Sequence, residues 1–153
     1  MIRILVAEDF GLLREDLCDT LDQQEDMEVA GSAATGREIE ELARSTPFDL
    51  ILMDIEMETT TAGIRAAERI LEHKPEAKVI FLTAHETDNM ILTSMGAGAV
   101  DYIVKGCDEG ELLRHIREAA AGRAALDDRV QSLLMKEYTR LRRSERSLLF
   151  FIT

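Results

Sequence analysis

Short apolar runs alternate with longer segments of helical spacing through the first 122 residues. The short runs cover Ile2 to Ala7, Met27 to Ala33, Leu50 to Met53, Lys78 to Thr83 and Val100 to Val104. The helical segments cover about Leu12 to Gln23, Arg37 to Ser45, Ala62 to His73, Thr87 to Met95 and Asp108 to Ala121. Apolar runs without polar alternation are typical of strands buried on both faces, so helices should cover a parallel sheet on each side. The pattern predicts an α/β domain with five βα repeats.

Acidic residues end two of these runs. Glu8 and Asp9 follow the first run, and Asp54 follows the third. If both runs are parallel strands of one sheet, three carboxylates meet at the edge where ligands bind in open α/β sheets. Carboxylates that close repel one another and raise each other's pKa values unless a cation lies among them. The sequence therefore implies a metal ion at this edge.

Thr83 and Lys105 end the fourth and fifth runs, at the same predicted edge. Each residue alone has an ordinary explanation, as a loop acid, a helix cap, a strand end or a solvated lysine. Together they suit phosphoryl transfer, with Asp54 as the nucleophile that forms an aspartyl-phosphate. Mg²⁺ prefers octahedral oxygen ligands, so Asp9 and Asp54 can bind it directly and Glu8 through a water. Lys105 and Thr83 can then contact the other phosphate oxygens.

Length and charge place further bounds on function. The 153 residues suit one compact domain with an appendage, and no apolar stretch approaches the roughly 20 residues that span a bilayer. We expect a cytoplasmic protein without membrane contacts, and reduced thiols without chemistry at Cys18 and Cys107. Residues 1–126 carry 12 basic against 26 acidic residues, a net −14, whereas residues 127–153 carry 6 against 4, a net +2. The body should therefore repel nucleic acid.

From Ile2 to about Gly122, the chain resembles the receiver domain of bacterial two-component response regulators. The likeness is carried by Val6-Ala7-Glu8-Asp9, Leu52-Met53-Asp54-Ile55, Thr83-Ala84, Tyr102 and Val104-Lys105. It implies a flavodoxin-like, doubly wound sheet of five parallel strands in the order 2-1-3-4-5. It also implies phosphorylation of Asp54 by a sensor histidine kinase.

The resemblance assigns further roles. In this family Mg²⁺ would be held by Glu8, Asp9, Asp54 and the backbone carbonyl of Glu56. The switch pair would be Thr83 and Tyr102.

Two positions depart from the family pattern. The family usually has Met-Pro and then Gly after the phosphorylated aspartate, whereas the segment from Met57 to Gly63 lacks the proline and is one residue longer. The family lysine is often followed by proline in a cis peptide, but Gly106 follows Lys105 here. A cis bond before glycine would cost about 2.5 to 4 kcal/mol, so none is assumed.

The tail resembles the linker and opening helix of a LuxR-type helix-turn-helix domain, as in NarL/FixJ regulators. The residues concerned are Leu126 to Val130 and Leu141 to Leu149. We therefore expect a receiver domain over residues 1–122, followed over residues 123–153 by a linker helix and the start of a truncated output domain. Promoter DNA would be contacted only through the missing part. Homodimer formation on phosphorylation is left open, and a basic amphipathic helix that pairs with itself or with a partner is the alternative.

Two other classes of function are compatible with parts of the sequence. A stand-alone receiver would signal by protein contact alone, which the tail argues against. A haloacid-dehalogenase-type phosphatase would carry Asp-x-Asp after its first strand, whereas Asp54-Ile55-Glu56 follows the third. We therefore expect a phosphoacceptor that regulates transcription rather than an enzyme.

Overall fold

The fold is seen in a computed structural model, which describes residues 1–123 and 126–152, with side chains up to residue 146. The strands are β1 (Ile2–Ala7), β2 (Met27–Ala33), β3 (Leu50–Asp54), β4 (Lys78–Thr83) and β5 (Asp101–Val104). The helices are α1 (Gly11–Asp22), α2 (Gly36–Ser45), α3 (Ala62–His73), α4 (Asp88–Gly96), α5 (Glu109–Ala120) and α6 (Asp128–Ile152).

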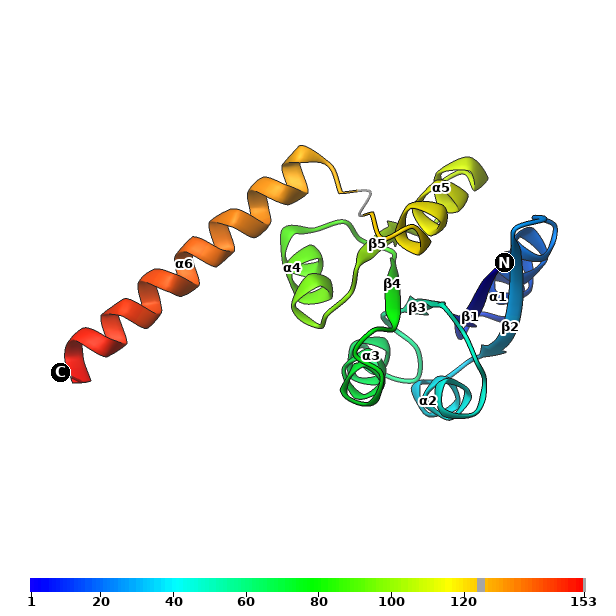
Figure 1. The fold of residues 1–153 in the computed structure, drawn as a ribbon, viewed down its shortest axis with the longest axis horizontal. Helices are drawn as coiled ribbons and strands as arrows, with labels where there is room; N and C mark the ends of the chain where they lie inside the picture. The colour runs from blue at the N-terminus through cyan, green and yellow to red at the C-terminus, as the bar shows by residue number, and fades with distance from the viewer. Residues whose placement is uncertain (124–125, 153) are drawn as a thin grey trace.

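The five strands form one parallel sheet in the order β2-β1-β3-β4-β5. Helices α1 and α5 cover one face, and α2, α3 and α4 cover the other (Figure 1). The predicted flavodoxin-like fold and strand order are therefore confirmed. Because the chain order reverses between β1 and β3, their carboxyl ends leave an open crevice in which ligands bind in such sheets.

Each face of the sheet has its own apolar core. Leu5 and Ala7 of β1 face the core formed with α2, α3 and α4, whereas Ile4 and Val6 face the core formed with α1 and α5. All four side chains are 0% exposed. Burial on both faces explains why the strands read as continuous apolar runs instead of alternating ones.

The helix boundaries lie within one or two residues of those predicted, and α3 has the predicted bounds. Asp108 caps α5, since its carboxylate accepts a hydrogen bond from the amide of Glu111 at 2.8 Å. Asp108 and Glu111 have the spacing of a capping box, but its reciprocal bond is absent from the described hydrogen bonds, because the Glu111 carboxylate contacts Arg114 and His115 instead. Gly36 is the first residue of α2, whose cap is Thr35.

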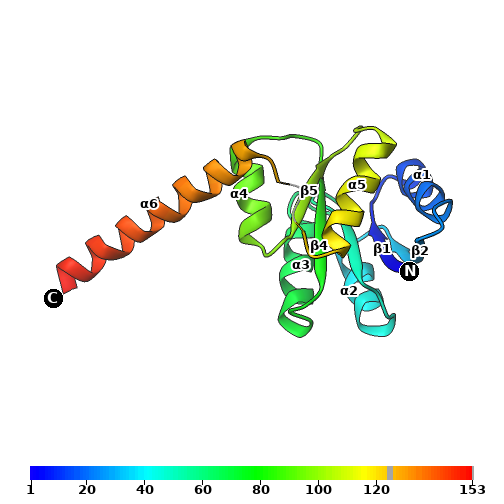
Figure 2. The same cartoon turned by 45° about the horizontal axis from the view of Figure 1, so that its top comes forward.

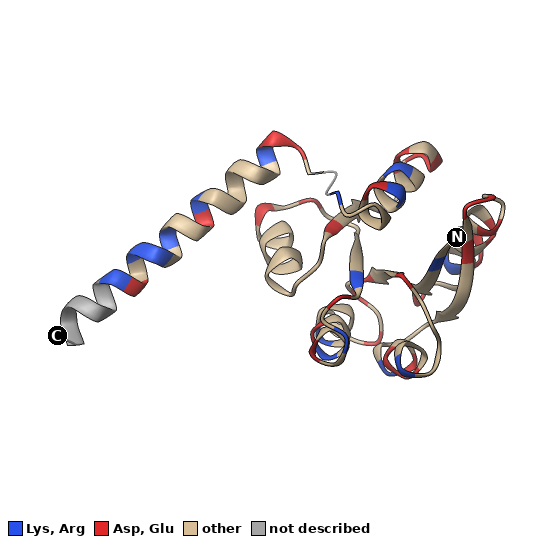
Figure 3. Ribbon diagram, in the orientation of Figure 1, with Lys and Arg blue, Asp and Glu red and all other residues tan. Residues whose placement is uncertain are grey.

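The tail is one continuous helix, α6, which leaves the body beside α4 (Figure 2). Basic side chains recur along it, interrupted by a few acidic ones (Figure 3). The predicted boundary between the receiver domain and the tail lies after residue 122. Residues 124–125, just beyond it, lie outside the described part of the chain. Among the described helices, none combines the length and the apolar character that crossing a membrane requires.

Candidate functional site

The strand register brings the predicted residues to one edge of the sheet. Ala7 pairs with Met53, so Glu8 follows β1 beside the end of β3. Asp54 pairs with Leu82, and Thr83 pairs with Val104, so Lys105 follows β5 at the same level. Parallel pairing thus assembles residues that are up to 97 positions apart in the sequence.

Three carboxylates and one ammonium group form the centre of the site. One oxygen from each of Glu8, Asp9 and Asp54 lies within 4.8 Å of the other two. Lys105 Nζ lies 3.1 Å from Glu8 Oε1 and 3.0 Å from Asp54 Oδ2. Glu8 is 1% exposed and Asp54 3% exposed, whereas Asp9 faces solvent. With all four groups ionised, the cluster carries an excess of two negative charges.

Two oxygens of the cluster are buried without hydrogen-bond partners, namely Glu8 Oε2 and Asp54 Oδ2. The Lys105 ammonium is near the second of these but does not meet it with hydrogen-bond geometry. Burial, and after it the neighbouring Glu8 carboxylate, raise the pKa of Asp54 above its ordinary value, although Lys105 opposes the shift. Unpartnered buried carboxylate oxygens are costly. A divalent cation would satisfy them and lower the pKa of Asp54, so the donor set fits Mg²⁺.

Burial disfavours the charge on Lys105, but its contacts with Asp54 and Glu8 outweigh this effect and raise the pKa of the ammonium. Lys105 therefore stays positively charged at neutral pH. The site thus offers one permanent cation to an anionic group bound beside Asp54.

A pocket of about 190 Å³ opens beside Asp54. Asp9, Glu56, Thr83 and Lys105 also line it. The Thr83 hydroxyl is directed within its own loop, donating to the carbonyl of His85 at 2.9 Å. All predicted metal-binding and phosphate-binding residues therefore lie together, with Glu8 buried just beneath the pocket.

Tyr102, like Glu8, is a predicted site residue that does not line this pocket. It is 8% exposed, and its hydroxyl donates to Glu86 Oε1 at 2.7 Å. Burial, and then the hydrogen bond to Glu86, raise the pKa of Tyr102, so its hydroxyl stays protonated at neutral pH. Tyr102 thus lies on the β5 side of the loop that follows Thr83.

The loop from Met57 to Thr61, which lacks the family proline, is held by Glu58. Both oxygens of its carboxylate lie within 2.9 Å of the backbone nitrogen of Gly36, at the first turn of α2. A carboxylate there also interacts favourably with the helix dipole. Gly63 closes the loop so tightly that a Cβ atom would lie 1.9 Å from the carbonyl oxygen of Asp54. The longer loop is therefore anchored at both ends.

The second departure from the family pattern has a simple backbone explanation. Gly106 has φ of +86°, a left-handed conformation that glycine adopts readily. In the described part of the chain no peptide bond is cis. The chain thus turns after Lys105 without the proline.

Sequence reasoning missed three side chains around the site. Arg14 Nη1 donates to the carbonyl of Glu8 at 2.8 Å, Glu58 anchors the β3–α3 loop, and Glu86 accepts from Tyr102. Glu58 could have been noticed, since it stands where the family has proline. Arg14 and Glu86 carry no signal in the sequence. Arg14 binds a backbone carbonyl in a loop, and Glu86 binds a tyrosine 16 positions away.

Comparison with known proteins gives the family. The family model of the response regulator receiver domain matches residues 4–117 of the sequence. The chain is 39% identical over 123 residues to an uncharacterized transcriptional regulatory protein, YxjL, of Bacillus subtilis, covering 80% of this chain and 56% of that protein. It is 35% identical over 144 residues to the transcriptional regulatory protein LiaR of the same organism, covering 94% and 66%. The chain thus spans 56% of the length of the first relative and 66% of the length of the second.

Solved structures agree. A LuxR-family two-component response regulator from Aurantimonas superposes with a TM-score of 0.78 at 27% identity, covering 90% of this chain and 97% of that one. The response regulator domain of Thermotoga maritima CheB gives a TM-score of 0.70 at 34% identity, covering 79% and 97%. Together with the assembled carboxylates and lysine, these matches lead to one conclusion: the chain belongs to the receiver domain family of two-component response regulators, among relatives of the LuxR type.

Proposed function

We propose that this chain is the phosphoacceptor of a two-component system, phosphorylated on Asp54 by a sensor histidine kinase in the presence of Mg²⁺. The observation that carries the proposal is the pair of unpartnered buried oxygens, Glu8 Oε2 and Asp54 Oδ2, beside the Lys105 ammonium. A merely structural cluster would be expected to satisfy these atoms within the protein.

The proposed residue roles follow from this geometry. Asp54 attacks the phosphorus of a phosphohistidine, so that a P–O bond to Asp54 forms while the P–N bond breaks and the imidazole nitrogen takes up a proton. Asp9, Asp54, the carbonyl of Glu56 and, through water, Glu8 would hold Mg²⁺, which would neutralise charge on the phosphoryl oxygens. Lys105 donates to a second phosphoryl oxygen. Thr83 can reach a third after giving up its bond to His85.

We propose further that phosphorylation controls a DNA-binding output domain in a longer protein, and so transcription. Support comes from the tail's likeness to a LuxR-type linker, from relatives named as transcriptional regulators, and from their greater length. Thr83 and Tyr102 would pass the signal on. Under this proposal the chain accepts a phosphoryl group as a signal and does not turn over a substrate.

A small phosphodonor tests the phosphoacceptor proposal. With acetyl phosphate and Mg²⁺, the wild-type chain should gain the mass of one phosphoryl group, and hydroxylamine should remove it because acyl phosphates react with that nucleophile. Asp54→Asn should gain none. The matched control is Asp16→Asn, which removes an exposed carboxylate from α1 and should label like the wild type.

Chelation of Mg²⁺ should abolish labelling of the wild type. Full hydroxylamine-sensitive labelling of Asp54→Asn would disprove the site assignment. Labelling unaffected by chelation would disprove the role given to the metal.

A further inference from the structure

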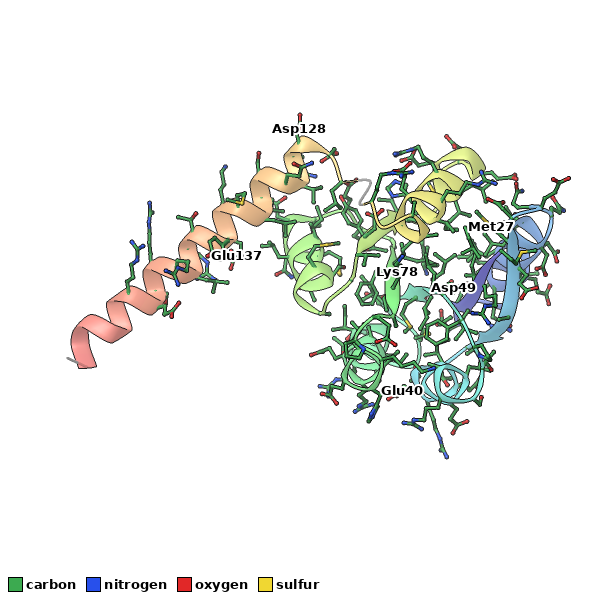
Figure 4. The ribbon with its side chains drawn as sticks, in the orientation of Figure 1. Met27, Glu40, Asp49, Lys78, Asp128 and Glu137 are labelled. Atoms are coloured by element: carbon green, nitrogen blue, oxygen red, sulfur yellow. The ribbon has the colours of Figure 1, made fainter. Side chains whose placement is uncertain are left out.

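The start of α6 is docked on the body through apolar contacts. Val130 is 2% exposed and belongs to the core cluster that contains Tyr102 and Ile91. Leu133 and Leu134 are partly buried against the same cluster. Figure 4 marks Asp128 at this docked end and Glu137 where the helix has left the body. The contact therefore joins the tail to the face of α4 and β5 that holds Tyr102.

A polar contact lies beside this apolar one. Arg129 Nη2 donates to Asp88 Oδ1 at 2.9 Å, and Arg129 Nη1 lies 3.8 Å from Glu86 Oε1. The same oxygen of Glu86 accepts the hydroxyl of Tyr102 at 2.7 Å. The Glu86 carboxylate therefore bridges Tyr102 on β5 and Arg129 on α6.

Glu86 is joined by the backbone to the Thr83 loop. The Thr83 hydroxyl donates to the carbonyl of His85, and the His85 amide donates back to Thr83 Oγ1 at 3.1 Å. His85 immediately precedes Glu86. A hydroxyl has one proton, so Thr83 can donate to His85 or to a phosphoryl oxygen on Asp54, but not to both. Binding of a phosphoryl group thus competes with the bond that holds this loop.

We propose that Glu86 links the docking of α6 to the phosphorylation site, so that the docked helix belongs to the unphosphorylated protein and a phosphoryl group on Asp54 weakens the docking. This inference rests on the proposed function. When Thr83 turns toward the phosphoryl group, the His85 carbonyl loses its donor and the neighbouring Glu86 shifts. Its bridge between Tyr102 and Arg129 is then weakened, and α6 is held by Val130, its apolar neighbours and the remaining bond between Arg129 and Asp88.

Linkage makes the effect reciprocal. If the phosphoryl group weakens docking by some factor, loss of docking must strengthen phosphoryl-analogue binding by the same factor. The side chains of Arg129 and Glu86 are 56% and 41% exposed, so solvent screens their attraction. An exposed ion pair corresponds to about a two- to fivefold change in an equilibrium constant. This is the size expected in both directions.

The test uses the whole chain, with beryllofluoride and Mg²⁺ as the phosphoryl analogue. Chemical shifts of Thr83 report analogue binding, and amide hydrogen exchange over residues 128–134 reports docking. In the wild type, saturating beryllofluoride should speed that exchange about two- to fivefold. Arg129→Gln should exchange faster without the analogue and bind beryllofluoride about two- to fivefold more tightly. The control Arg143→Gln removes an exposed charge further along α6 and should match the wild type.

A double-mutant cycle identifies the route. Glu86→Gln keeps an acceptor for Tyr102 but removes the charge that faces Arg129. Arg129→Gln also removes the bond to Asp88, so if Glu86 and Arg129 act as one link, the double variant should resemble Arg129→Gln alone. Strictly additive effects on exchange would overturn the role of Glu86.

The remaining outcomes separate this inference from the proposed function. Beryllofluoride binding seen at Thr83, with exchange over residues 128–134 unchanged or slowed, would overturn this inference alone. Complete absence of beryllofluoride binding would overturn the proposed function, and the inference with it.

Discussion

Strand side chains of the receiver body are enclosed by helices on both faces, whereas the described side chains of α6 contact the body over the first turns of the helix. Phe81 in β4 is 0% exposed, but Met135, Tyr138 and Leu141 of α6 are all more than half exposed. Charge differs as well, since residues 1–126 carry a net −14 and residues 127–153 a net +2.

This difference shows which part of the molecule can act as a signal. Contacts of the body are numerous and buried, so its fold has one stable arrangement. Among the described side chains of α6, up to residue 146, the contacts with the body are one buried valine, a few half-buried neighbours and exposed ion pairs, so its docking is an equilibrium that modest forces can shift. The body therefore holds the proposed phosphorylation site, and the tail is suited to respond to it.

A core truncation should give the largest contrast between the two regions. Phe81→Ala empties a fully buried position and should lower the free energy of unfolding by about 3 to 5 kcal/mol. Leu141→Ala removes a side chain that is 53% exposed and should change it by no more than about 0.5 kcal/mol. Urea unfolding followed by circular dichroism measures both. Similar losses would mean that the tail is integrated in the core.

A single added methyl group should distinguish a tightly packed turn of the body from a loose one. Gly63→Ala places a Cβ atom 1.9 Å from the Asp54 carbonyl oxygen, a backbone atom that cannot move freely, so we expect a loss of about 1 to 3 kcal/mol. Gly96→Ala is the matched control, because its Cβ would meet nothing within 4 Å and should be neutral or stabilising. Unfolding midpoints that fall equally in both variants would contradict the packing argument.

The same contrast explains what the sequence could predict. Doubly buried strands leave continuous apolar runs, and parallel strand ends must meet at one edge, so the sheet, its order and the assembly of Glu8, Asp54 and Lys105 follow from pattern and likeness. Contacts made by loops do not, because they depend on the path of the chain. Neither the anchoring of Glu58 on Gly36 nor the position of Glu86 has a periodic signal.

Competition for the Glu111 carboxylate explains why the capping box at the start of α5 is incomplete. Asp108 and Glu111 have the right spacing, and the cap itself forms. The reciprocal bond is not among the described hydrogen bonds, because the Glu111 carboxylate contacts Arg114 at 2.8 Å and His115, one turn later on α5, at 2.9 Å. Spacing along one helix cannot show such a choice, since His115 is itself held by Asp101 of β5.

Shortening a side chain at the docked end of α6 should reduce amide protection in the tail more than in the body. Val130→Ala removes two buried methyl groups, which corresponds to about 1 to 2 kcal/mol of docking free energy. Amide exchange over residues 128–134 should accelerate roughly tenfold, whereas amides of β4 should keep their protection. Ser132→Ala, an exposed position on the same turn, is the control. Equal loss of protection in β4 would show that tail and body unfold together.

The smallest expected effect concerns His115, which joins β5 to α5 within the body. Its ring contacts Asp101 through Nδ1 at 2.5 Å and Glu111 through Nε2 at 2.9 Å, and its side chain is 12% exposed. The bond to Asp101 outweighs burial, which opposes the charge, and raises the pKa of His115 above its ordinary 6.5. A histidine whose pKa is higher in the folded state stabilises that state when protonated, so this contribution is complete below pH 6.5 and is lost as the pH rises through the raised pKa. Because Glu111 is half exposed and water screens its charge, we expect less than about 1 kcal/mol. The free energy of unfolding of the wild type minus that of His115→Gln should therefore decrease between pH 6 and the alkaline range. A difference that stays flat with pH would show that the ring does not change its charge in the folded body.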